Sequence, residues 1–161
     1  MLEKNIIKIV ERQLKEYPYK DRLIEDIYNE MEFLGSRNKD LNSYLQSKGR
    51  ISSSVENEVM QRSVLEEQIN KHRKWKEVIE TVLEIYKEYD IQKYNYMKMK
   101  FFTGNSVLAI ELETTIGGSV QTRYKRDIIL YIAIFAAQEN LICMQKLNSI
   151  IKKRAKNESR K

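Results

Sequence analysis

The chain has 161 residues, a mass of 19.2 kDa and a formal net charge of +6, from 29 Lys and Arg against 23 Asp and Glu. One cysteine excludes an intramolecular disulfide and a cysteine-based zinc cluster, and one histidine argues against a zinc hydrolase or a His-based triad. One proline and five glycines in a chain that is 42% hydrophobic favour long helices over a loop-rich sandwich, so we expect an all-α protein.

Two amphipathic helices and the turn between them are predicted at the N-terminus. Apolar side chains follow helical spacing over residues 2–16 and again over residues 21–33. Tyr17-Pro18 separates the two segments, because the residue before a proline is pushed out of the helical region. The pattern predicts a helical hairpin over residues 1–34.

A polar segment and a long helix follow. Residues 35–52 are mixed in charge with scattered Gly, Asn and Ser, which predicts a linker. Ser53 and Glu56 can then form a capping box. Helical spacing continues from Val55 for about 35 residues, which corresponds to a helix about 50 Å long. Such a helix is longer than a small core, so we expect it to pair with another helix or with another subunit. Together with a shorter helix that follows, it forms the segment 53–102.

Three features of this segment could suggest a binding site. His72 lies on the apolar stripe with no second ligand in sequence, so we expect a partly buried histidine rather than a metal or catalytic group. Aromatic and Met residues over 91–102 alternate with lysines, which could stack on bases, but their helical spacing favours the core. A basic cluster lies beside His72 and is formed by Lys71, Arg73, Lys74 and Lys76. It is either a solvated flank of the helix or a contact surface for nucleic acid or an acidic partner.

Residues 103–145 contain two short helical patterns joined by a turn with two glycines. The first covers residues 106–113, the polar turn covers Thr114–Gly118, and Ser119 can cap the second helix, which starts at Val120. A helix, a glycine-containing turn and a second helix with one basic face form the layout of a helix-turn-helix. We therefore predict a DNA-binding region here.

Helical projection divides the second helix into an inner and an outer face. Val120, Tyr124, Ile128 and Tyr131 share one side, which can pack inward. The opposite side and its flanks carry hydroxyl, amide and cationic groups, which suit base edges and phosphates in a major groove. The candidate DNA-binding residues are Ser119, Gln121, Thr122, Arg123, Lys125 and Arg126. We expect no catalytic residue, metal ligand or cofactor.

The positive charge lies at the C-terminal end of the chain. Residues 1–120 carry 19 basic and 20 acidic side chains, whereas residues 121–161 carry 10 basic and 3 acidic ones. This distribution is typical of a polyanion-binding end, with residues 146–161 as a basic tail, although a solvated tail without a partner stays open. The tail lacks an aromatic or Leu-rich face for membrane insertion.

Residues 128–137 form an apolar run that a surface helix does not tolerate in water. Either the N-terminal helices or a second copy of the chain must cover it, and we expect a homodimer whose interface includes part of this run. Cys143 follows this run and is expected to be a small buried residue. The run is too short to span a bilayer and the N-terminus lacks a signal-peptide pattern, so we expect a soluble, cytoplasmic protein without a membrane partner.

Several stretches together resemble one family of regulators. They are Val10–Pro18, Leu23–Met31, Ser54–Glu56, and the C-terminal part with Lys100–Phe102 and Arg123–Ile129. In this order and spacing they are similar to the ArpU/RinA-type regulators of bacteriophages and prophages of Gram-positive bacteria. The similarity covers most of residues 5–140.

The resemblance implies an activator of phage late genes with a sigma-region-4-like helix-turn-helix. Such a protein would bind promoter-proximal double-stranded DNA and act with host RNA polymerase. By resemblance, Arg123, Lys125 and Arg126 match basic positions of the family's recognition helix. The turn before that helix departs from the family: it has two more residues, and Gly117-Gly118 replaces the customary Ser, which predicts a different tilt or less rigidity.

Other functions stay open beside a DNA-binding regulator. A small-terminase-like DNA-packaging recognition subunit would share the DNA-binding end and would form a ring. An interaction module would bind a host protein through the long helix and would have no affinity for DNA. An enzyme is the least favoured class, because Gly117-Gly118 lacks the Lys-Ser/Thr of a phosphate loop, and the carboxylates lie where a solvated helix face places them.

Overall fold

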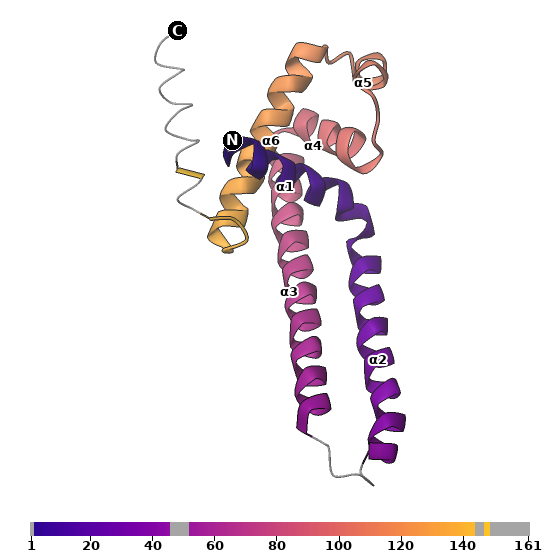
Figure 1. Ribbon diagram of the computed structural model, residues 1–161. Coiled ribbons are helices and arrows are strands. Elements are labelled where there is room, and N and C mark those ends of the chain that lie inside the picture. The colour runs from indigo at the N-terminus through magenta and orange to yellow at the C-terminus, as the bar shows by residue number, and fades with distance from the viewer. Residues whose placement is uncertain (1, 46–51, 144–146, 149–161) are drawn as a thin grey trace. The chain divides into compact units, whose positions relative to one another are not determined.

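The fold is seen in a computed structural model that describes residues 2–45, 52–143 and 147–148. The described residues form helices and no strand, as expected for an all-α chain (Figure 1). In chain order the elements are α1 (Leu2–Glu16), η1 (Tyr17–Tyr19), α2 (Lys20–Leu45), α3 (Ser52–Tyr89), α4 (Ile91–Met97), η3 (Lys98–Phe102), α5 (Val107–Thr114) and α6 (Gly118–Gln138). Within the described part, no helix is both long and apolar enough to cross a membrane.

The chain divides into two compact units. The larger unit comprises residues 1–18 and 74–161, and the smaller one comprises residues 19–73. The long helix α3 contributes residues to both, so the predicted segment 53–102 does not correspond to one unit. The chain therefore combines its N-terminal helix with its C-terminal half in one core.

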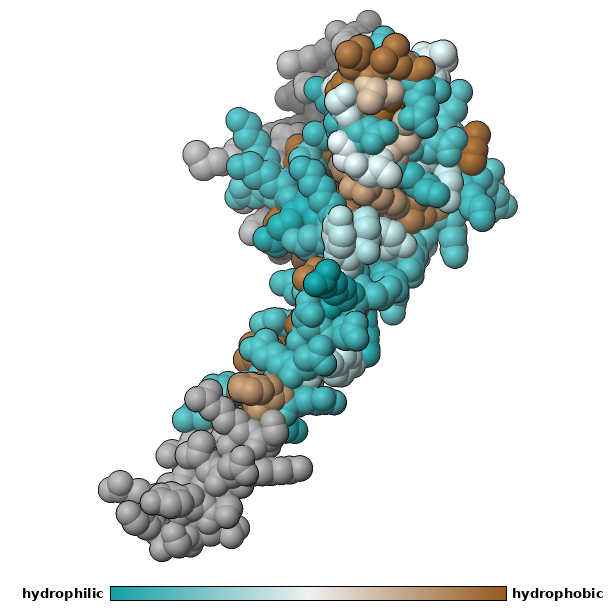
Figure 2. All heavy atoms as spheres, turned by 90° about the vertical axis from the view of Figure 1, so that its right-hand side faces the viewer, coloured by the Kyte–Doolittle hydropathy of each residue, from teal (hydrophilic) through white to brown (hydrophobic). Residues whose placement is uncertain are grey.

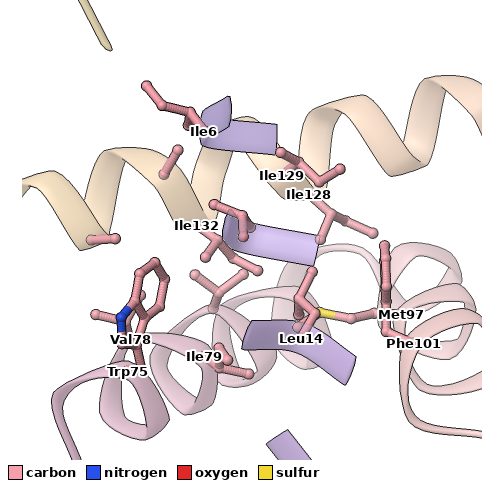
Figure 3. Packing of buried hydrophobic residues seen from close by; sticks show 14 of the residues in the cluster. Ile6, Leu14, Trp75, Val78, Ile79, Met97, Phe101, Ile128, Ile129 and Ile132 are labelled. Carbon is pink, nitrogen blue, oxygen red and sulfur yellow. The ribbon is translucent and has the colours of Figure 1, made fainter. Parts of the chain in front are cut away.

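The core of the larger unit is built from α1, the second part of α3, α4, η3, α5 and α6. Figure 3 shows side chains from α1, α3, α4, η3 and α6 pointing into one cluster. Full burial of one such aliphatic or aromatic side chain stabilises the fold by about 1.5–3 kcal/mol. Among the deepest residues are Val10, Leu14, Trp75, Ile79, Val82, Tyr96, Met97, Ile110, Ile128 and Ile132. The aromatic and Met pattern over 91–102 thus belongs to the core, as predicted.

The predicted hairpin of residues 1–34 is wrong, because α1 and α2 belong to different units. The apolar face of α1 is buried in the larger core, where α1 packs against α6 and η3. In α2, Ile27 is buried with Leu65 and Ile69 of α3 in the smaller unit. Proline does follow α1, but its fixed φ is compatible with a 3-10 turn that leads into another helix. Local spacing of apolar residues does not determine against which distant apolar face each helix packs.

The predicted linker of residues 35–52 is also corrected, since α2 continues to Leu45. A single glycine inside a helix costs only about 1 kcal/mol, and no proline follows Gly35 to stop the helix. Residues 46–51 lie outside the described part of the chain, as do residue 146 and residues 149–161 of the predicted basic tail. The start of α3 at Ser52 is close to the predicted capping box.

The apolar run 128–137 is covered by the chain's own residues. Ile128, Ile132, Ala133 and Ala136 are fully buried in the core that α1 shares. This outcome matches the first of the two alternatives, cover by an N-terminal helix, so the run no longer argues for a second copy. The homodimer stays a prediction without that support.

His72 and Cys143 differ in how far their side chains are buried. His72 is partly buried, as predicted, and its Nδ1 lies 3.1 Å from the buried Lys20 Nζ within the smaller unit. Cys143 is exposed, so its predicted burial is wrong. The reason is local: α6 ends at Gln138, and Ile142 and Leu147 take the buried positions on either side of the cysteine.

Candidate nucleic-acid interface

The two helices predicted for the DNA-binding region are present as α5 and α6. Ser106 Oγ accepts a hydrogen bond from the Ala109 N–H at 3.1 Å, which caps α5. Thr115 ends α5 in the left-handed conformation, with φ of 59°. The N-cap of α6 is Gly117, so the expected cap, Ser119, lies in the first helical turn instead. Both ends of α5 and the start of α6 lie within about two residues of those predicted, a normal scatter for helix ends.

Gln121 does not lie on the outer face, which corrects its assignment as a DNA-binding residue. Its side chain is 1% exposed, and its Nε2 donates to the carbonyl oxygens of Val107 at 2.9 Å and Ile116 at 2.8 Å. Gln121 Oε1 is buried and has no hydrogen-bond partner in the described part of the chain. The flank of α6 that carries Gln121 faces α5, so the amide joins both helices and their turn instead of reaching a base.

Aromatic side chains hold the inner face of α6 against α4. Tyr124 is buried, packs edge-on against Tyr96 at 6.0 Å between ring centroids, and donates its hydroxyl to Gln92 Oε1 at 2.7 Å. Lys93 Nζ lies over the Tyr124 ring at 5.7 Å and pairs with Asp127 at 3.8 Å. These contacts fix the rotation of α6 and therefore decide which side chains protrude.

The protruding side chains occupy the first turns of α6. Ser119, Thr122, Arg123 and Arg126 are all exposed. Within the described residues, neither arginine forms an ion pair or a side-chain hydrogen bond. Thr122 Oγ1 donates to the Gly118 carbonyl at 2.9 Å, which leaves the oxygen's acceptor positions open. Four of the six predicted residues therefore share one solvent-facing surface.

Lys125 lies at the edge of that surface and is paired within the chain. Its Nζ is 2.7 Å from Glu11 Oε1 on α1, with 39% and 24% of the two side chains exposed. A pair exposed to this degree stabilises by about 0–1 kcal/mol. No local pattern in the sequence could reveal it, because the two partners lie far apart in the chain. Lys125 is therefore less available than its position on α6 suggests.

The outer face of α5 is chemically different from that of α6. Val107, Leu108 and Leu112 are exposed, together with Glu111 and Glu113, and α5 contains no basic residue. Figure 2 views the side on which α5 lies and shows hydrophobic side chains at the surface there. A Cβ on Gly117 would lie 3.8 Å from Glu111 Oε1, so this carboxylate adjoins the positive N-terminus of α6. Phosphate contacts are favoured on α6 and not on α5.

Charge is divided unequally between the two units. By sequence, the larger unit carries 20 Lys and Arg against 13 Asp and Glu, whereas the smaller unit carries 9 against 10. The excess positive charge thus belongs to the unit that contains α6. Among the described residues, no group of three or more His, Cys, Asp or Glu is arranged to hold a metal ion.

Comparison with known proteins adds no assignment: no family model, no curated protein and no solved structure matches this chain.

Proposed function

We propose that this protein is a sequence-specific DNA-binding transcriptional regulator that reads double-stranded DNA with the first turns of α6. The observation that carries the proposal is the exposed surface of Ser119, Thr122, Arg123 and Arg126, whose arginines are unpaired among the described residues. Arginine can bind guanine O6 and N7 together, and Ser or Thr hydroxyls can bind either kind of base pair. In this proposal α5 and α6 form a helix-turn-helix with α6 as the recognition helix.

The rigidity of the surface supports the proposal. Gln121 ties α6 to α5 and to the turn, and Tyr124 ties it to α4. A recognition helix held in this way loses little conformational entropy when it enters a groove, which favours specific contacts. The net positive charge of the larger unit adds a sequence-independent attraction to the phosphate backbone.

The regulatory role rests on the resemblance to ArpU/RinA-type regulators. Activation of phage or prophage late genes, with host RNA polymerase as a protein partner, follows from that resemblance and is part of the proposal. The DNA-packaging alternative has no observation in its favour here. It is distinguished by mass in solution, because a packaging subunit forms a ring of many chains whereas the expected regulator is a dimer.

Selection of bound fragments from a random duplex pool tests the proposal. We expect a defined site, and we expect Arg126→Ala to weaken binding to that site by about 1–3 kcal/mol and to relax the base preference at one position. Arg22→Ala, which removes an exposed arginine of the smaller unit, is the matched control and should leave the preference unchanged. Equal binding of every duplex at moderate salt, or no binding, would contradict a sequence-specific regulator.

A further inference from the structure

The outer face of α1 carries three lysines, Lys4, Lys8 and Lys15, called here the α1 lysine stripe. All three side chains are exposed, and within the described part of the chain none of them has an ion-pair partner. Some other cations of the same unit are paired, such as Lys93 with Asp90 at 3.2 Å. The stripe therefore has charge available for an external anion.

The stripe lies on the side of α1 that borders α6. Glu11 marks that side, because its carboxylate reaches Lys125 of α6 at 2.7 Å. At about 100° per residue, the three lysines lie only about 20–60° around the helix axis from Glu11. The α1 lysine stripe therefore adjoins the edge of α6 that Lys125 marks.

The exposed surface of α6 begins at the same edge. Thr122 and Arg126 lie about 60° and 100° from Lys125 around α6, on the side away from the buried Ile128. The exposed faces of the two helices thus meet at the Glu11–Lys125 pair. The opposite face of α1 is buried against the core, as Figure 3 shows for Ile6 and Leu14, which keeps the stripe in place.

We propose that the α1 lysine stripe contacts the phosphodiester backbone of the same DNA duplex that α6 reads. This inference rests on the proposed function and adds a second, sequence-independent arm to the interface. A lysine ammonium neutralises a phosphate and releases condensed counterions whatever the base sequence. A basic amphipathic helix can also bind an anionic membrane, but that mode needs its apolar face for lipid. In α1 the apolar face is already buried in the core.

The experiment compares the salt dependence of duplex binding for four proteins. The probe is a fluorescein-labelled 30-base-pair duplex of arbitrary sequence, and the chains are wild type, the triple variant Lys4→Gln/Lys8→Gln/Lys15→Gln, the single variant Glu11→Gln, and a control. The control, Arg22→Gln/Arg37→Gln/Arg62→Gln, makes the same change in charge within the smaller unit. Gln is close to Lys and Arg in helix propensity, and circular dichroism checks that each chain is folded.

The slope of log K against log salt concentration is expected to fall by about 2–3 in the triple variant, because each lost phosphate contact removes about 0.9. Glu11→Gln is expected to steepen the slope by about one, since Lys125 is then unpaired. The control should retain the wild-type slope. Wild-type slopes in both α1 variants would overturn the inference while leaving the proposed function intact. The inference would also be overturned if wild type, Glu11→Gln and the control bound phosphatidylserine vesicles and the triple variant did not. Wild-type protein that binds no duplex at low salt would overturn both proposals.

Discussion

Gln121 is the residue whose role differs most from its sequence assignment. Its amide group donates to carbonyls at the start of α5 and just before α6, so one side chain spans the whole turn. An amide is suited to this task because it carries two N–H donors on one atom. A residue expected to read DNA thus positions the helix that is proposed to do so.

Replacement of Gln121 by Leu is expected to lower the free energy of unfolding by about 2–3 kcal/mol. The leucine has a similar size but cannot donate, so the carbonyl groups of Val107 and Ile116 lose this side-chain hydrogen bond. Urea titration followed by circular dichroism measures the change. Thr122→Val, at an exposed neighbouring position, is the control and should stay within about 0.5 kcal/mol of wild type. A loss below about 0.5 kcal/mol in Gln121→Leu would show that these hydrogen bonds do not hold the turn.

The turn between α5 and α6 is the element on which the proposed interface depends. Thr115 adopts a φ of 59°, a region where a β-branched side chain is disfavoured by about 1–2 kcal/mol. Its N–H still donates to the Glu111 carbonyl at 2.9 Å, which closes the end of α5. The strain is therefore stored at the point where the chain changes direction toward α6.

Thr115→Asn is expected to raise the free energy of unfolding by about 0.5–1 kcal/mol. Asparagine tolerates the left-handed region better than threonine and does not add the backbone entropy of glycine to the unfolded chain. Thermal denaturation should show a higher Tm for this variant. The same substitution at Thr122, inside α6, gives the comparison and should bring no gain. A lower Tm for Thr115→Asn would mean that the threonine hydroxyl, which donates to Thr114 O, outweighs the strain.

At the scale of the whole molecule, the distribution of charge and burial matters more than any single contact. The excess of basic residues lies in the unit formed by both ends of the chain, and the other unit is nearly neutral. Most of this excess comes from residues 146–161, which carry 7 Lys and Arg against 1 Glu, and the exposed cations of α1 and α6 belong to the same unit. The same unit buries several tyrosines, which makes its stability depend on pH at the alkaline end.

Stability is expected to fall as the pH rises from 10 to 12. Burial, with a smaller contribution from the Glu11 charge, raises the pKa of Tyr96 from 10.0 to about 12, and burial also raises the pKa of Tyr86. As the pH rises, these tyrosines lose their protons at a lower pH in the unfolded chain than in the folded chain. Their contribution to the free energy of unfolding is therefore fully present below pH 10 and declines above it. For Tyr96 the decline is about 1.4 kcal/mol per pH unit.

Urea unfolding at pH 9 and pH 11 measures this loss. Tyr96→Phe should reduce the difference between the two pH values, because phenylalanine does not ionise. Tyr89→Phe, at a position that is 77% exposed, serves as the control and should leave the difference unchanged. An equal pH dependence in both variants would show that Tyr96 ionisation does not limit alkaline stability.

Periodicity and composition predicted the helical class, the long helix α3, the core position of the aromatic residues in 91–102, and the α5–turn–α6 segment. These features are local, since a helix and its apolar stripe depend on residues three or four apart. The exposure of Ser119, Thr122, Arg123 and Arg126 follows from the same spacing. Their contact with DNA stays a prediction.

Tertiary packing alone decided which apolar helix faces pack together. It paired α1 with α6 instead of α2, extended α2 into the expected linker as far as Leu45, turned Gln121 toward α5, and brought Glu11 to Lys125. Each of these outcomes depends on residues far apart in the chain or on the competition between several apolar faces for one core. Helical spacing specifies the face that a side chain occupies, but the neighbour of that face is chosen by burial over the whole unit.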